Sequence, residues 1–199
     1  MATCKRVNSA LDNPINYLTA QNLTGRANDL NALLDSMSTA INTIQAANNG
    51  ITSITKLVQS AQSIVNQAQQ TTDTTIRANL ATQYDQIRSQ IDQLAQDSGI
   101  NGINLLNGDT LTVTMNETGT SKVSVVGVTD LTSGAVAINA SANNWSGATD
   151  ISAASTQLTA ALTTLRSQSQ GLSANLQTVQ VRQDFTKAMI NTLQTGADN

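Results

Sequence analysis

The sequence predicts a mainly α-helical protein: an elongated antiparallel bundle or coiled coil of long helices with a small β-hairpin region. Apolar residues recur at alternating spacings of four and three over two long segments, and the period falls to two between them. Only 39% of the 199 residues are hydrophobic and 2% are aromatic. A compact core of this size needs more bulky side chains, so an extended arrangement of helices is favoured.

A first long helix is expected from about Pro14 to Gln70. Asn13 suits the N-cap position because its side-chain oxygen can accept a free backbone N–H, and proline at the next position loses no helical hydrogen bond. Two consecutive steps of three in the apolar pattern, next to Asn49 and Gly50, should overwind the helix locally, so a break at Asn49 is the alternative. The predicted packing seam of this helix contains Leu23, Leu30, Leu34, Met37, Ile41 and Ile44.

A second helix is expected at about 74–97, with Asp73 as its N-cap and Gly99 placed to end it. Its apolar face is predicted to contain Ile76, Leu80, Tyr84, Ile87, Ile91 and Leu94.

A third helix is expected at about 151–195 and carries a second long heptad pattern. Its predicted packing seam contains Leu158, Leu162, Leu165, Leu172, Leu176 and Val179. Polar residues occupy three other seam positions, at Ser169, Gln183 and Thr186. Such residues lower the stability of a coiled coil but restrict its register.

The segment at about 104–148 is predicted to form a β-hairpin and loops. Leu111, Val113 and Met115 alternate with threonine, and the turn sequence "NETG" precedes a second alternating run. Trp145 is the expected anchor of the loop-rich connection that follows. Because an isolated hairpin is only marginally stable, it should pack against the helices. All of these elements are expected to form a single domain over residues 1–199.

Composition argues against enzyme chemistry. The chain has no His, one Cys and one Glu, so no catalytic, cofactor-binding or metal-ligating set can be assembled from the usual residues. Asp85 and Asp92 are interpreted as solvated charges on a helix, and Cys4 is given no role. Basic residues are too scattered for nucleic-acid binding, and no apolar run of about 18 residues indicates a membrane span.

Three segments carry a resemblance to a known family. "RVNSALDNPINYLTAQNLTGRANDL" (6–30) resembles the start of the first rod helix of bacterial flagellins. "IDQLAQDSGINGINLLNG" (91–108) resembles the second helix of that family as it runs into its hairpin, and "ALTTLRSQSQGLSANLQTVQVRQDF" (161–185) resembles the C-terminal rod helix. The order and spacing of the segments also match.

The resemblance implies a structural subunit of the flagellar filament. It implies an extracellular location after export by the flagellar secretion apparatus, with other flagellin subunits, the cap and junction proteins as partners and no cofactor. The chain resembles a truncated, non-polymerising rod core, without the terminal polymerisation segments of the family. A hook-filament junction protein remains an alternative, as does a coiled-coil adaptor or secreted effector.

Many flagellins activate an animal Toll-like receptor through a ridge that resembles Leu-x-Arg-x-Arg-Glu-Leu. The matching segment is "ITSITKL" (51–57), in which Ser53 and Thr55 stand at the arginine positions, Lys56 at the glutamate and Leu57 at the last leucine. The resemblance therefore implies weak or no activation of this receptor.

Overall fold

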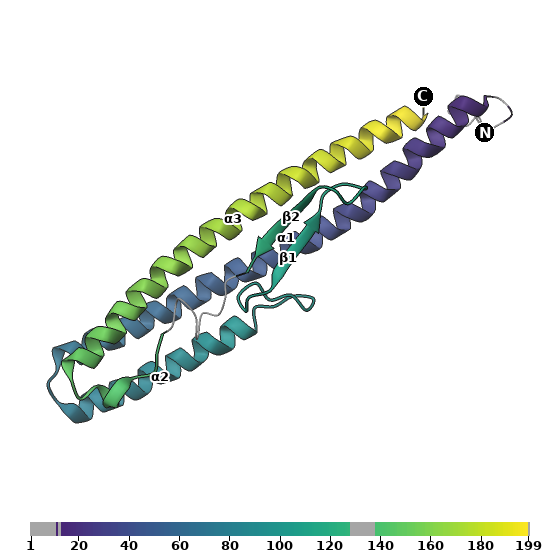
Figure 1. Ribbon diagram of the computed structural model, residues 1–199. Helices are drawn as coiled ribbons and strands as arrows, with labels where there is room; N and C mark the ends of the chain where they lie inside the picture. The colour runs from purple at the N-terminus through teal and green to yellow at the C-terminus, as the bar shows by residue number, and fades with distance from the viewer. Residues whose placement is uncertain (1–10, 12, 128–137, 199) are drawn as a thin grey trace, which may run out of the picture. The chain divides into compact units, whose positions relative to one another are not determined.

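The computed structural model describes residue 11, residues 13–127 and residues 138–198 (Figure 1). Three long α-helices dominate it, and two short antiparallel strands form one small sheet, which confirms the predicted fold class. In chain order the elements are α1 (Pro14–Gln70), α2 (Thr74–Gln96), β1 (Thr110–Thr114), β2 (Lys122–Val126), the 3₁₀ helix η1 (Ala142–Trp145) and α3 (Ala148–Asp198).

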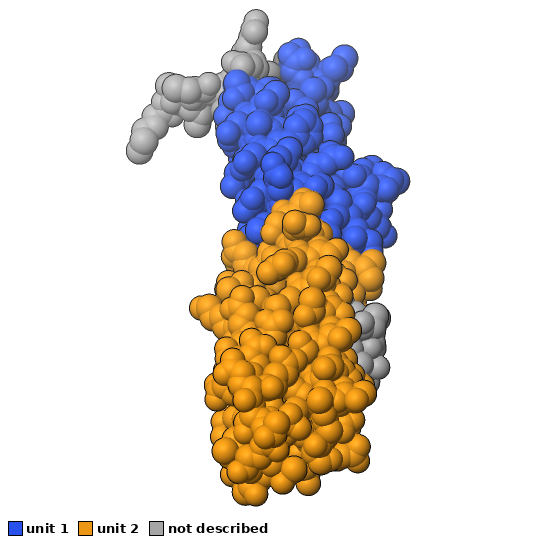
Figure 2. All heavy atoms as spheres, turned by 90° about the vertical axis from the view of Figure 1, so that its left-hand side faces the viewer, with its two compact units in different colours: residues 1–41, 112–124, 175–199 blue, residues 42–111, 125–174 orange. Residues whose placement is uncertain are grey.

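The chain divides into two compact units, coloured separately in Figure 2. Unit 1 contains residues 1–41, 112–124 and 175–199, and therefore the start of α1, the tip of the hairpin and the end of α3. Unit 2 contains residues 42–111 and 125–174, which include the rest of α1, all of α2 and the start of α3.

Side-chain caps begin the first two helices where the sequence predicts them. The Asn13 side chain accepts a hydrogen bond from Asn16 N at 3.1 Å. The Asp73 carboxylate accepts bonds from the backbone N–H groups of Thr75 and Ile76, at 2.8 and 3.1 Å. These contacts satisfy backbone donors that have no partner within the first helical turn.

Helix α1 continues through Asn49 and Gly50 without a break. Gly50 is buried, and a Cβ atom built on it would lie 2.6 Å from Leu106 Cδ1 and 3.0 Å from Ser98 Cβ. The absence of a side chain therefore allows the segment after α2 to approach α1 closely. Glycine costs about 1 kcal/mol of helix propensity here relative to alanine, and the close packing offsets that cost.

The end of α2 differs from the prediction. The helix ends at Gln96 with Asp97 as its C-cap in a right-handed conformation, and the described glycines with positive φ are Gly102, Gly108 and Gly119. Gly99 is therefore not a left-handed cap. Instead, the side-chain amide of Asn104 donates to the carbonyl oxygens of Ala95 and Gln96, at 2.8 and 2.9 Å. This amide satisfies carbonyls that the helix leaves without internal partners.

The hairpin follows the predicted alternation. Leu111, Val113 and Met115 are all buried, and the turn closes with a bond from Gly119 N to Asn116 O at 3.1 Å. Gly119 has a φ of 70°, a left-handed value that glycine adopts without steric cost. Residues 128–137 of the predicted loop region lie outside the described residues.

Replacing Gly50 by alanine should destabilise the chain, although alanine is the better helix former. The added methyl group would force Leu106 and Ser98 to move, and overpacking of this kind costs about 1–3 kcal/mol. Urea unfolding followed by circular dichroism measures the effect.

Gly25→Ala is the matched control, because Gly25 is also inside α1 and nothing lies within 4 Å of a Cβ atom built on it. This variant should gain about 1 kcal/mol from helix propensity alone. Equal stability of the two variants would contradict the close packing at Gly50.

Candidate functional site

In unit 1, the start of α1 packs against the end of α3. Ala27 and Leu30 form one buried apolar cluster with Ile190 and Leu193. A Cβ atom built on Gly196 of α3 would lie 3.4 Å from Leu23 Cδ1 of α1. Further along α1, Ser38 accepts a hydrogen bond from Gln183 Nε2 at 2.8 Å. Residue numbers rise along one helix as they fall along the other, so the pairing is antiparallel.

In unit 2, a polar pair joins α1 to α3. Ser169 Oγ donates to Asn48 Oδ1 at 3.3 Å, and both residues occupy seam positions of their heptad patterns. Ile51 and Leu165 line a groove beside this pair and are almost completely buried. Because a polar seam residue is best satisfied opposite another, this pair favours one register over those shifted by a turn.

None of the predicted seam residues is exposed. Eight are buried: Leu30, Met37, Ile44, Leu158, Leu162, Leu165, Leu172 and Val179. The other four are partly buried: Leu23, Leu34, Ile41 and Leu176. The described chain therefore covers the seam within its own units.

Arg77 is a buried cation that the apolar pattern of α2 did not reveal. The prediction placed Ile76 on the packed face, but Ile76 is 48% exposed and its neighbour Arg77 is 9% exposed. Arg77 Nε donates to the carbonyl oxygens of Ala68 and Thr71, and Nη1 donates to Ser146 O at 3.3 Å. The guanidinium thus satisfies carbonyls at the end of α1 and ties that end to the start of α3.

Trp145 anchors the connection before α3, as the sequence predicts. Its side chain is fully buried and its ring centroid lies 4.9 Å from that of Tyr84 on α2, with the rings tilted by 53°. Tyr84 Oη donates to Asn139 O at 3.1 Å. Burial raises the pKa of Tyr84 to about 12, with a smaller contribution from the negative charge of Asp85.

The backbone at Trp145 adopts an unusual conformation. Asn143, Asn144 and Trp145 have φ values of 49°, 50° and 54°, in the left-handed region that is unfavourable for a bulky side chain. Asp85 holds the segment by accepting bonds from Ser141 N and Ser141 Oγ, at 2.8 and 2.7 Å. The interpretation of Asp85 as a solvated charge was therefore wrong.

Asp92 is also engaged rather than simply solvated. Its carboxylate lies 3.6 Å from Arg88 Nη1, one helical turn earlier on α2. An ion pair at this spacing adds only a few tenths of a kcal/mol to helix stability.

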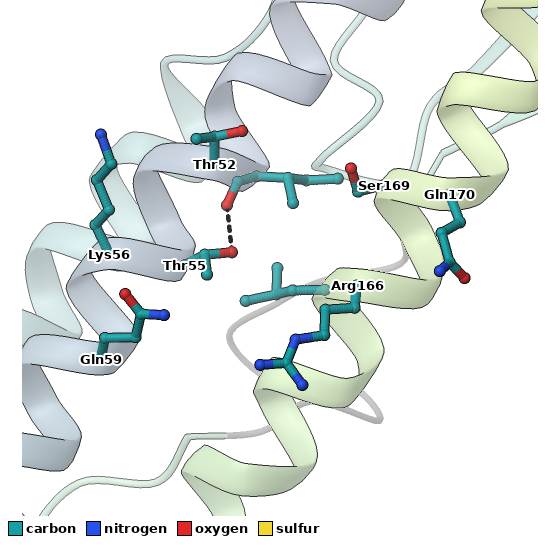
Figure 3. Close-up of a pocket in the computed structure, with 9 residues that line it drawn as sticks. Thr52, Thr55, Lys56, Gln59, Arg166, Ser169 and Gln170 are labelled. Carbon is teal, nitrogen blue, oxygen red and sulfur yellow. Dashed lines mark hydrogen bonds between the residues drawn. The ribbon is translucent and has the colours of Figure 1, made fainter.

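The segment 51–57 lies on unit 2 beside the groove between α1 and α3 (Figure 3). Ser53 and Lys56 are exposed, whereas Thr55 and Leu57 are partly buried. Thr55 Oγ1 donates to Ile51 O at 2.7 Å, so its hydroxyl is directed to its own helix. Lys56 and Arg166 both line this groove, which has a volume of about 490 Å³ and no carboxylate among its lining residues.

In unit 1, Arg26 of α1 pairs with Glu117 at the tip of the hairpin. A hydrogen bond from the backbone N–H of Glu117 to its own carboxylate lowers the pKa of that carboxyl below its ordinary value, and Arg26 lowers it further. Because the pair is solvent-accessible, it contributes little to stability, but it fixes where the hairpin tip meets α1.

More than half of the chain matches a known protein family. Residues 1–110 match the family described as the bacterial flagellin N-terminal helical region. The chain belongs to the flagellin family. Over 113 residues it is 30% identical to flagellin FljN of Caulobacter vibrioides, an alignment that covers 56% of this chain and 41% of that flagellin. The chain thus spans less than half the length of this curated relative.

The described residues were compared with the requirements of a membrane-spanning helix and of a metal site. None of the helices in this part of the chain combines the length and hydrophobicity that a membrane crossing requires. Nor does this part contain three or more acidic, Cys or His side chains grouped to hold a metal ion.

The raised pKa of Tyr84 predicts a loss of stability at alkaline pH. In the unfolded chain the phenol ionises near pH 10, whereas the folded chain retains the proton until about pH 12. The contribution of Tyr84 is therefore complete below pH 10 and falls by up to roughly 3 kcal/mol between pH 10 and 12.

Chemical denaturation at a series of pH values measures this loss. Tyr84→Phe should be less stable at neutral pH, because it loses the bond to Asn139 O, but its stability should change less between pH 10 and 12. If the free energy of unfolding falls equally between pH 10 and 12 in both proteins, the alkaline loss does not come from Tyr84.

Proposed function

We propose that the chain is the rod-forming part of a flagellar filament subunit, a structural protein without catalytic activity. Membership of the flagellin family supports this function, and the observation that carries it is the match over residues 1–110. That match includes all of α1 and α2. In unit 2, Asn48 of α1 bonds to Ser169 of α3, and Arg77 of α2 bonds to Ser146, just before α3. Within each unit α1 pairs with α3, and long helices paired in this way suit the rod of such a subunit.

The proposal includes the partners and the location of the protein. Its partners are other flagellin subunits, and the flagellar cap and junction proteins at the two ends of the filament. The protein is exported by the flagellar secretion apparatus and functions outside the cell. The similarity to flagellin FljN favours a filament subunit over a junction protein.

The burial of the seam disfavours a coiled-coil adaptor or secreted effector. An adaptor of that kind would keep its apolar seam available for another chain. The predicted seam residues are instead covered within each unit, most completely at Met37, Ile44 and Leu158. Any surface that pairs with other chains must therefore be a different one.

Peptide mapping by mass spectrometry of filaments sheared from the source bacterium tests the proposed function. The tryptic peptide from Ala27 to Lys56 should be abundant in these filaments, because trypsin cleaves after Arg26 and Lys56. If the peptide is absent or present only in trace, the protein is not a main filament subunit.

Weak activation of the Toll-like receptor is part of the same proposal. Ser53 and Lys56, at two of the positions that resemble the receptor-binding ridge, are exposed but lack the arginine and the glutamate of stimulatory flagellins. Thr55, at the other arginine position, is partly buried beside Arg166 in the groove. An arginine at that position would therefore lie near a second positive charge.

The chain should elicit a weaker response in receptor reporter cells than a stimulatory flagellin does. The triple variant Ser53→Arg, Thr55→Arg, Lys56→Glu should raise the response, whereas Asn66→Arg, an added charge elsewhere on the exposed surface of α1, should not. A strong response from the unmodified chain would overturn this part of the proposal.

A further inference from the structure

Three Asn–Gly pairs occur in the sequence, at residues 49–50, 101–102 and 107–108. In this dipeptide the backbone nitrogen that follows asparagine is unusually accessible, because glycine has no Cβ atom. The nitrogen can attack the side-chain amide of the asparagine when the backbone rotates to bring the two groups together. The surroundings of each pair therefore determine how fast it reacts.

Asn101 and Gly102 form an exposed two-residue turn between α2 and β1. Ile100 and Ile103 close this turn by exchanging backbone hydrogen bonds of 2.9 and 3.0 Å. The φ values of Asn101 and Gly102 are 52° and 79°, as in the turns that favour Asn–Gly. Within the described residues, neither the Asn101 side chain nor the Gly102 N–H has a hydrogen-bond partner. Nothing lies within 4 Å of a Cβ atom built on Gly102, so the turn can open without displacing a packed side chain.

The pair at Asn49 and Gly50 has the same local sequence but a different backbone. Both Asn49 and Asn101 are exposed, and each is followed by glycine and then isoleucine. Gly50, however, lies inside α1, where the helix directs its N–H toward a carbonyl of the preceding turn. It is also buried against Leu106. The attack at Asn49 therefore requires opening of a packed helix, which costs more free energy than opening an exposed turn.

The third pair, Asn107 and Gly108, is exposed but held on both sides. The backbone N–H groups of Asn107 and Asp109 both donate to Asn104 O, at 3.0 and 3.2 Å. The Asp109 carboxylate also accepts a bond from Asn104 N at 2.7 Å. Rotation of this pair would break more hydrogen bonds than opening of the turn at Asn101. Its reactivity is therefore expected between those of the other two pairs.

We propose that Asn101 is a site of spontaneous deamidation, a modification of the backbone that needs only water. Hydroxide removes the proton from Gly102 N, which attacks Asn101 Cγ and closes a cyclic imide. The bond from Cγ to Nδ2 breaks, and the amide nitrogen takes a proton from water and leaves as ammonia. A second water molecule then opens the ring. Attack on the side-chain carbonyl gives aspartate, whereas attack on the main-chain carbonyl gives isoaspartate.

The modification changes the chain where α2 ends. Either product adds a carboxylate to the turn, so each modified copy becomes more negative. Isoaspartate also adds a methylene group to the main chain, which no longer fits the two-residue turn closed by Ile100 and Ile103. The next residue is Asn104, whose side-chain amide caps α2. The proposal does not depend on the filament function.

Incubation of the purified 199-residue chain at pH 8, followed by digestion at acid pH and peptide mapping, tests the proposal. Asn101 should be converted at least about tenfold faster than Asn49, because its turn opens more readily than the helix. Asn107 should react at an intermediate rate. Electron-transfer fragmentation distinguishes isoaspartate from aspartate at each position.

The unfolded chain is the matched control. In concentrated guanidinium chloride the backbone differences vanish, so Asn49 and Asn101 should react at similar rates in their shared Asn-Gly-Ile sequence. Asn101→Gln is a second control, because its longer side chain must close a larger ring. This variant should form no isoaspartate at position 101 and leave the rates at Asn49 and Asn107 unchanged. Circular dichroism checks that it keeps its helices.

Three results would overturn the proposal. The first is an Asn101 that stays unmodified in the folded chain while the unfolded chain reacts. The second is a folded chain in which Asn49 or Asn107 reacts first. The third is a ratio of the Asn101 rate to the Asn49 rate that is no larger in the folded chain than in the unfolded chain.

Discussion

The antiparallel contact between α1 and α3 is the interaction on which the remaining structure depends. Helices with so few charged pairs gain little stability from their own surfaces, and in proteins most helical stability comes from packing of an apolar face. Each fully buried Leu, Ile, Val or Met contributes about 1.5–3 kcal/mol. Met37 and Ile44 on α1, and Leu158 and Val179 on α3, are of this kind.

Polar residues in the seam add specificity to this apolar packing. Asn48 bonds to Ser169 in unit 2, and Ser38 bonds to Gln183 in unit 1. A shift of one helix by a turn would separate both pairs and leave polar groups facing apolar ones, which costs free energy. Neutral amide and hydroxyl groups thus determine the register of the helices in this protein, as charged residues do in many coiled coils.

In unit 2, α2 and the segment before α3 add contacts to those between α1 and α3. Arg77 bonds to carbonyls at the end of α1 and before α3, and Trp145 packs on Tyr84. Asp85 compensates for the left-handed backbone near Trp145 by binding Ser141. The start of α3 is therefore fixed by α2 as well as by α1.

Features that depend on periodicity could be predicted from the sequence. The heptads locate the seam, Asn13 and Asp73 locate helix starts, and alternation locates the hairpin, because each pattern follows from local geometry. Contacts with partners distant in the sequence could not be predicted. The sequence alone predicts a weak point of the helix at Gly50, because the close approach of Leu106 involves a residue far away in the sequence.

Arg77 and Asp85 illustrate the same limit. Asp85 was interpreted as a solvated charge, and the apolar pattern did not single out Arg77. The serine that donates to Asp85 and two of the carbonyls that accept from Arg77 lie in loops without regular spacing.

Membership of the flagellin family and the burial of the seam fit together. If each chain satisfies its own inner seam, assembly must use other surfaces. A coiled-coil adaptor would instead exchange this seam between chains. The pairing of α1 with α3 must therefore form inside one chain.

Site-specific crosslinking tests that claim most directly. With Cys4→Ser to remove the native thiol, Ser38→Cys and Gln183→Cys place two thiols where the native side chains are joined by a bond of 2.8 Å. A short bis-maleimide in dilute solution should join them within a single chain. The control pair Ser36→Cys and Gln183→Cys, with one thiol about 200° around α1, should react poorly. Crosslinks formed mainly between chains would contradict the account.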